Sequence, residues 1–174
     1  DQDRRLAQDG GGENRGGRVT DSNQKPIYAR RVASFRDGPV EQAVRQLADR
    51  DEIRELVSIY AHRMARGLAV ADLFTDDGAY INQGTPNMPP REIRGRAALD
   101  TYYGGRDGWA DHPLPMIHNH VIEVTGDEAT GICSMELRMA SEGESIIASG
   151  YYLDRYRYEG GNWKFVERDY ASFH

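Results

Sequence analysis

The chain lacks the features of several common protein classes. Cys133 is the only cysteine among 174 residues, so no intrachain disulfide can form, and a lone thiol in an expected strand is most often a small buried hydrophobe. No apolar run approaches the roughly 20 residues that a membrane-spanning helix needs. The sequence shows no signal-peptide pattern. We therefore expect no membrane partner and a reducing, cytoplasmic setting.

The chain also has fewer basic than acidic residues. The 22 Lys and Arg residues are outnumbered by 28 Asp and Glu residues, which gives a net charge of −6. Non-specific binding of nucleic acid needs a basic face, so nucleic acid is not an expected partner. Gly104-Gly105 lacks the strand and helix that flank a phosphate-binding loop, and no nucleophile elbow is present. We expect no cofactor.

The first 39 residues differ in composition from the rest. Gly10-Gly11-Gly12 and Gly16-Gly17 stand among Asp, Arg, Asn and Gln residues, and such a stretch buries too little apolar surface to offset its ordering entropy. Residues 1–39 are therefore predicted to form an arm, which either stays a floppy tail or lies against its own domain or a neighbouring subunit. Residues 40–174 are long enough for one domain with a sizeable core.

Periodic apolar residues predict helices at the start of this domain and strands at its end. A helical pattern begins at Val40, and the Asp49 and Glu52 pair resembles a capping box that starts a second helix over residues 50–66. Residues 75–78 read as a turn and residues 79–82 as a short strand. Longer strands are predicted at residues 116–124, 129–140, 145–158 and 163–170. Helices followed by hairpins indicate an α+β fold, with helices on one face of a curved antiparallel sheet.

Six short motifs follow one another in a fixed order. They are Asp51–Leu56 leading to Tyr60, Leu73–Gly78, Ile93–Arg96, Asn119–Asp127, Gly150–Asp154 and Gly161–Phe165. Together they resemble the SnoaL-like branch of the nuclear-transport-factor-two-like superfamily, over about residues 41–174. The resemblance implies a cone-shaped sheet, wrapped by helices, around a deep pocket. Its relatives include polyketide cyclases, steroid isomerases, dehydratases and non-enzymatic binding or assembly subunits, so pocket residues must decide the function.

The chain departs from the catalytic pattern of that family. In its dehydratases, a Tyr or Lys on the first long helix precedes an Asp by five residues, and that Asp pairs with a His on the first long strand. Tyr60 matches the first position, but Ala65 stands in place of the Asp and Pro115 in place of the His. The family's acid-base pair is therefore not carried over to this chain.

Three residues remain candidates for catalysis. His118 is the predicted general base, since an imidazole titrates near neutral pH. Tyr60 is predicted to donate a hydrogen bond to a substrate oxygen. By its distance from Trp163, Arg157 resembles an arginine of a related dehydratase and is predicted to counter developing negative charge. The alternatives are a histidine at the sheet edge, a core tyrosine and a solvated arginine.

Further residues are predicted to bind the substrate. They are Tyr80, Trp109, Met116, Asn119 and His120. On a regular strand His118 and His120 share one face and Asn119 takes the other, unless a bulge intervenes. The two histidines, with His112, have no Cys, Asp or Glu at tight spacing, so no metal site is expected.

These observations lead to one hypothesis and two alternatives. The leading hypothesis is a cofactor-independent lyase or isomerase that acts on a mostly apolar, oxygenated small molecule, such as an aromatic, polyketide or steroid-like compound. The second is a non-catalytic binding or assembly protein, which Ala65 in the place of the Asp supports. The third is an accessory subunit of a ring-hydroxylating oxygenase. In each case a homo-oligomer through the outer sheet face is expected.

Overall fold

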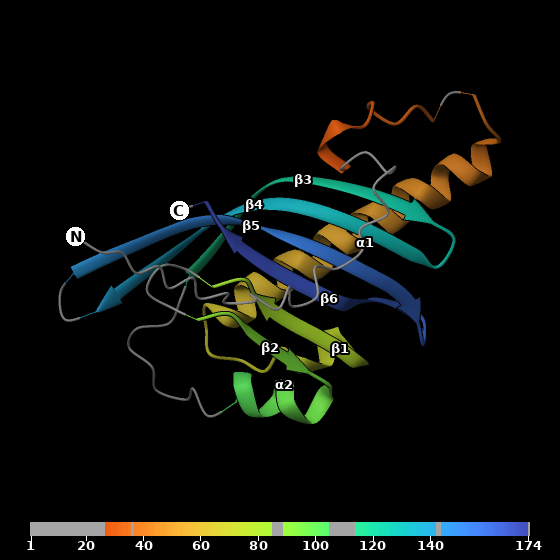
Figure 1. Ribbon diagram of the computed structural model, residues 1–174. Coiled ribbons are helices and arrows are strands. Elements are labelled where there is room, and N and C mark those ends of the chain that lie inside the picture. Colours follow the sequence, from red (N-terminus) through yellow and green to blue (C-terminus); the bar gives the residue numbers. More distant parts are fainter. Residues whose placement is uncertain (1–26, 36, 85–88, 105–113, 142–143, 174) are drawn as a thin grey trace, which may run out of the picture.

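The described residues form one long α-helix, one short α-helix and a six-stranded sheet (Figure 1). This computed structural model describes residues 27–35, 37–84, 89–104, 114–141 and 144–173. The elements, in order, are η1 (Ile27–Ala29), α1 (Val40–Met64), η2 (Ala71–Leu73), β1 (Phe74–Asn82), β2 (Arg91–Arg94), α2 (Arg96–Tyr103), β3 (Leu114–Thr125), β4 (Glu128–Ser141), β5 (Glu144–Glu159) and β6 (Asn162–Ser172).

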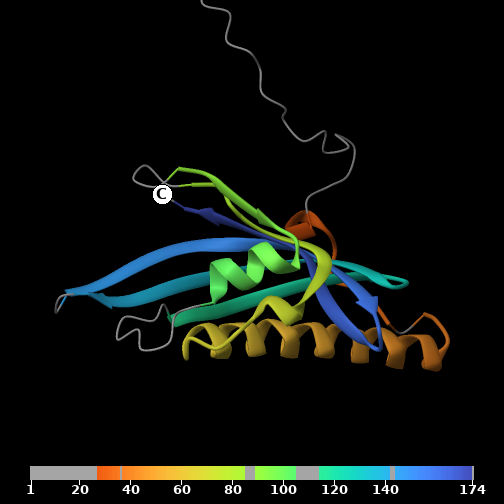
Figure 2. The ribbon, with the colours of Figure 1, turned by 90° about the horizontal axis from the view of Figure 1, so that it is seen from below.

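The sheet has the strand order β2-β1-β6-β5-β4-β3, and α1 lies along one of its faces (Figure 2). Strands β3 to β6 are joined as successive antiparallel hairpins, as the sequence predicted. The α+β class is therefore confirmed. The sheet is mixed, because β1 pairs with β6 in parallel while its other neighbouring strands are antiparallel.

Helix α1 is continuous where the sequence predicted a break. It runs for 25 residues through Asp49, so the capping box predicted there does not form. The Asp49 carboxylate instead accepts a hydrogen bond from the indole Nε1 of Trp163, at 3.2 Å. The buried side of α1 carries Ile53, Leu56, Val57 and Tyr60, which recur at the helical period.

The predicted turn at residues 75–78 is part of strand β1. The pairing of β1 with β6 shifts register between Phe74 and Ala79, so the turn-like composition marks an irregular strand. Thr75 is fully buried there, and its hydroxyl donates to the carbonyl of Phe165. Gly78 is required in this crowded segment, because a Cβ at this position would lie 2.9 Å from the Cβ of Phe74. The strand predicted at 79–82 is confirmed.

Two bulges decide which side chains face α1. In β3, Asn119 has a φ of 40°, and the register with β4 shifts between His118 and Val121. In β6, Val166 is the extra residue, because Tyr156 pairs with Phe165 while Arg155 pairs with Glu167. An extra residue exchanges the two faces of a strand beyond it. As a result His120 and Arg168 point toward the interior.

The space between the sheet and the helices is filled mainly by aromatic rings. Tyr60 from α1, Tyr103 from α2 and Phe74 from β1 meet there with rings from β5 and β6. Rings of this kind supply most of the apolar area that holds the layers together. Two charged side chains, those of Asp154 and Arg168, are buried at the centre of this aromatic core.

Candidate functional site

Asp154 and Arg168 form a fully buried ion pair on the face of the sheet that α1 covers. They lie directly opposite each other on β5 and β6, with Gly131 of β4 on one side and Tyr80 of β1 on the other. The Arg168 Nη2 atom is 3.7 Å from Asp154 Oδ2, and both side chains are 0% exposed. Burying a charge is costly unless it is paired, so each of these groups depends on the other.

Aromatic rings surround the guanidinium of Arg168. Its central carbon lies 3.7 Å from the ring centroid of Tyr152, 4.2 Å from that of Tyr60 and 4.7 Å from that of Phe165. Such contacts favour a desolvated cation. Burial opposes the charge of Arg168, but Asp154 and neighbouring groups outweigh burial and hold the guanidinium pKa above its usual value. Arg168 is therefore a permanent positive charge in the core.

Three polar atoms of this pair have no hydrogen-bond partner within the described residues. They are Asp154 Oδ1, Arg168 Nε and Arg168 Nη1. Most buried polar atoms in folded proteins are paired, so unpaired ones need an explanation. One acceptor and two donors of this pair are thus left free in a part of the core that is closed to solvent.

A chain of side chains holds the other oxygen of Asp154. The Tyr156 hydroxyl donates to Asp154 Oδ2 at 2.8 Å, and His120 Nε2 lies 3.2 Å from the same hydroxyl. Because the single phenolic proton goes to Asp154, we assign the His120 ring proton to Nε2. Gly131 makes room for this chain, since a Cβ there would lie 2.9 Å from His120 Nε2. The carboxylate is thus oriented with Oδ1 free.

The protein environment shifts the pKa values of both Asp154 and His120. Burial raises the pKa of Asp154 to about 6, although Arg168 and the Tyr156 hydrogen bond act in the opposite direction. Burial lowers the pKa of His120 to about 4, with the charges of Arg168 and Arg54 adding to the effect. At neutral pH Asp154 is therefore an ionised carboxylate of raised basicity, and His120 is uncharged.

Tyrosine side chains from α1, α2 and β1 also belong to the site. The Tyr60 hydroxyl lies 3.1 Å from that of Tyr103, and burial raises the pKa of both groups. Tyr80 stacks on Tyr102 at 5.6 Å between ring centroids, and burial raises the pKa of Tyr80 as well. These phenols stay protonated at neutral pH and act as hydrogen-bond donors.

Comparison with known proteins identifies the family. Residues 45–169 match the SnoaL-like domain. The chain belongs to this family. No curated protein matches the chain.

Solved structures agree with this assignment. A variant of Rv3472, a protein of unknown function from Mycobacterium tuberculosis, has a TM-score of 0.66 and 28% identity, with 78% of this chain and 76% of that chain covered. An NTF2-like protein with a cystatin-like fold from Novosphingobium aromaticivorans has a TM-score of 0.64 and 26% identity, covering 77% and 88%. A scytalone dehydratase-like protein of that organism has a TM-score of 0.64 and 21% identity, covering 74% and 87%. At this identity the last likeness shows the fold alone.

The structure of this SnoaL-like protein brings some predicted residues into the site. Tyr60, Tyr80 and His120 belong to the buried cluster around Arg168. His118 and Asn119 are exposed, and Met116 is 47% exposed, because the bulge turns only His120 inward. His118 is therefore not brought together with Tyr60. Trp109, with His112, lies outside the described residues.

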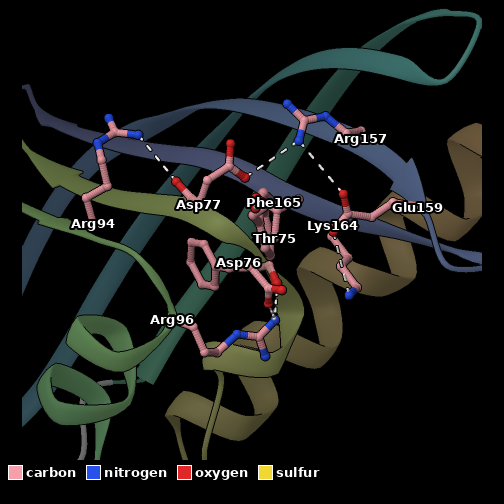
Figure 3. A network of polar contacts seen from close by, with 10 residues as sticks. Thr75, Asp76, Asp77, Arg94, Arg96, Arg157, Glu159, Lys164 and Phe165 are labelled. Atoms are coloured by element: carbon pink, nitrogen blue, oxygen red, sulfur yellow. Dashed lines mark hydrogen bonds and ion pairs between the residues drawn. The ribbon is translucent and has the colours of Figure 1, made fainter.

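Arg157 lies apart from the buried cluster, at a half-exposed position. Figure 3 shows its guanidinium between the carboxylates of Asp77 and Glu159, at 3.6 and 3.8 Å. Asp77 lies on the irregular part of β1, so Arg157 ties the end of β5 to that strand. It faces away from Asp154, which is buried three residues earlier on the same strand. This placement matches the solvated-arginine alternative and gives the predicted catalytic role no support.

Sequence reasoning missed three central residues of the site, Asp154, Tyr156 and Arg168. A signal was present in β5, where Tyr152, Asp154 and Tyr156 alternate and so share a face. A carboxylate between two aromatic residues on an inward face is a candidate buried acid. For Arg168 the alternation was hidden by the bulge at Val166.

Two expected absences concern metals and membranes. Within the described ranges, no group of three or more His, Cys, Asp or Glu residues is placed to hold a metal ion. None of the helices described is long and apolar enough to cross a membrane. Homo-oligomer formation stays a prediction; Val121 and Leu153, which are exposed apolar residues, lie on the sheet.

Proposed function

We propose that this SnoaL-like protein is a cofactor-independent enzyme that moves a proton on a mostly apolar, oxygenated small molecule, as a lyase or isomerase does. The observation that supports this most is the free Oδ1 of Asp154 beside the free N–H groups of Arg168, in a site walled by aromatic rings. A carboxylate of raised basicity next to a fixed cation is an arrangement for proton abstraction beside a carbonyl group.

In the proposed reaction, Asp154 is the base. The substrate carbonyl oxygen accepts hydrogen bonds from Arg168 Nε or Nη1, and Asp154 Oδ1 removes a proton from the adjacent carbon. The C–H electron pair moves into the new C=C bond, and the carbonyl π electrons move to oxygen. The resulting enolate carries its negative charge on the oxygen that faces Arg168. This charge exists only after proton removal, so the contact stabilises the product of that step more than the ketone.

The protonated Asp154 then completes one of two reactions. In an isomerisation it returns the proton to a different carbon. In an elimination the enolate re-forms its carbonyl, the C=C electron pair moves to form the bond between the α and β carbons, and the β hydroxyl leaves with the C–O electron pair and takes the proton of Asp154 to become water. A buried phenol such as Tyr60 donates a hydrogen bond to the leaving hydroxyl. Tyr156 and His120 act as positioning residues, because they hold Oδ2 and leave Oδ1 facing the substrate.

Deuterium exchange tests this proposal without knowledge of the natural substrate. We expect the protein to speed the incorporation of deuterium next to the carbonyl of 2-tetralone, a fused aromatic ketone, in D₂O, as followed by proton NMR. General base catalysis contributes about 100-fold or more, which is well above the buffer rate. His118→Ala is expected to keep the wild-type rate, because His118 is exposed.

The outcome separates three hypotheses. Exchange that survives in His118→Ala supports Asp154 as the base. Exchange that is lost in that variant, with the fold intact, would return the role to His118. Saturable binding of 2-tetralone and of related ketones without any exchange would instead favour the non-catalytic binding protein.

A further inference from the structure

A cavity lies between the N-terminal arm, α1 and the edge strand β3. Its volume is about 410 Å³. The described part of the arm follows the edge of the sheet, where η1 lies beside β3 and β4. The arm thus forms one wall of the cavity, and α1 and β3 form the others.

The walls of this cavity carry a strong excess of positive charge. Arg30 and Arg31 come from the arm, Arg50 and Arg54 from α1, and the lining includes one carboxylate, that of Glu123. Glu123 is already paired with Arg30. Across the described residues, no carboxylate forms an ion pair with Arg31, Arg50 or Arg54.

Arg50 has no counter-ion among the described residues. Its Nε atom is buried and has no hydrogen-bond partner in the described part of the chain, and its guanidinium lies 4.9 Å from the ring of Phe35. Burial, and then the charge of Arg54, lower the pKa of Arg50. Arg54 also helps to lower the pKa of His120, which lines the same cavity. An anion in the cavity would relieve both repulsions.

The rest of the lining indicates what kind of anion fits. Ile27, Val32 and Ile122 contribute apolar walls beside the arginines. Guanidinium groups pair with carboxylate and related oxyanions through two parallel hydrogen bonds. We propose that this cavity is a second binding site, which takes an organic anion with an apolar body and a carboxylate head. This site meets the buried cluster of Asp154 and Arg168 only at His120, and the inference goes beyond the proposed function.

Calorimetric titration of the full chain with 2-naphthoate tests this inference. The neutral analogue 2-naphthamide has the same apolar body and is expected to bind at least about tenfold more weakly, the equivalent of one charge-assisted hydrogen bond. Arg50→Met and Arg54→Met are each expected to weaken 2-naphthoate by a similar factor. Arg45→Met is the matched control, because Arg45 is an exposed residue of the same helix outside the cavity.

Asp154→Asn distinguishes this site from the proposed catalytic one. It is expected to bind 2-naphthoate as the wild type does, whatever happens to deuterium exchange. Tighter binding in Asp154→Asn, which removes a negative charge beside Arg168, would place the ligand in the buried cluster and overturn the inference. Equal binding of 2-naphthoate and 2-naphthamide, or unchanged binding in both α1 variants, would overturn it as well. Neither result bears on the proton transfer proposed for Asp154.

Discussion

Asp154→Asn is expected to lower the rate of deuterium exchange into 2-tetralone by about 100-fold or more while the protein stays folded. The amide has nearly the shape of the carboxylate and can still accept the hydrogen bond from Tyr156. It cannot remove a proton from carbon, because an amide oxygen is a very weak base. Rates measured by proton NMR in D₂O, at saturating and at low 2-tetralone concentrations, check this expectation.

Two companion variants make the result specific. Tyr156→Phe removes the hydrogen bond to Oδ2 but leaves the base, so its rate should fall less than that of Asp154→Asn. His118→Ala should match the wild type. If Asp154→Asn kept more than about a tenth of the wild-type rate, Asp154 would not be the general base.

Arg168→Met is expected to lower the free energy of unfolding by about 3–5 kcal/mol at neutral pH. Methionine fills part of the same volume, so the main loss is electrostatic. Asp154 would remain as an unpaired charge inside a fully buried site, and the ring contacts to Tyr60 and Tyr152 would lose their cation. Urea denaturation followed by circular dichroism measures the change.

A double-mutant cycle shows whether the unpaired charge is the cause. Arg168→Met combined with Asp154→Asn should be more stable than Arg168→Met alone, because the second change removes the buried charge. The deficit of Arg168→Met should also shrink as the pH falls toward 6 and level off below that value, where Asp154 is protonated in the wild type as well. Without Arg168 the pKa of Asp154 rises further, so the carboxyl group is neutralised by protonation at higher pH than in the wild type. Strict additivity of the two changes, with no pH dependence, would contradict this explanation.

The sequence predicted the regular parts of the fold for a physical reason. The buried side of α1 and the hairpins from β3 to β6 have clear periods of 3.6 and 2, which follow from one face being packed and the other solvated. A short polar motif, by contrast, led to a wrong prediction of a helix boundary. Asp49 and Glu52 resemble a cap, but tertiary packing against Trp163 continues the helix through them.

The residues that make up the site were harder to predict, because one extra residue in a strand exchanges the faces to which the later side chains point. Asn119 adds one residue to β3, and this sends His120 rather than His118 inward. Val166 does the same in β6 and sends Arg168 inward. A bulge depends on pairing with the partner strand, so the alternation of apolar and polar residues along the sequence does not reveal it. Tyr60, whose direction depends only on the helix period, was placed correctly inside.

The pH dependence of exchange, measured together with the titration of Asp154 itself, tests the central claim most directly. Because only the ionised carboxylate is a base, kcat/KM should rise with pH through a pKa of about 6. The carboxyl carbon of Asp154, followed by carbon-13 NMR against Asp154→Asn, should titrate with the same pKa. His120 stays neutral throughout this window, since its pKa is about 4. A flat profile, or a carboxyl group that titrates below pH 4, would contradict the assignment of Asp154 as the base.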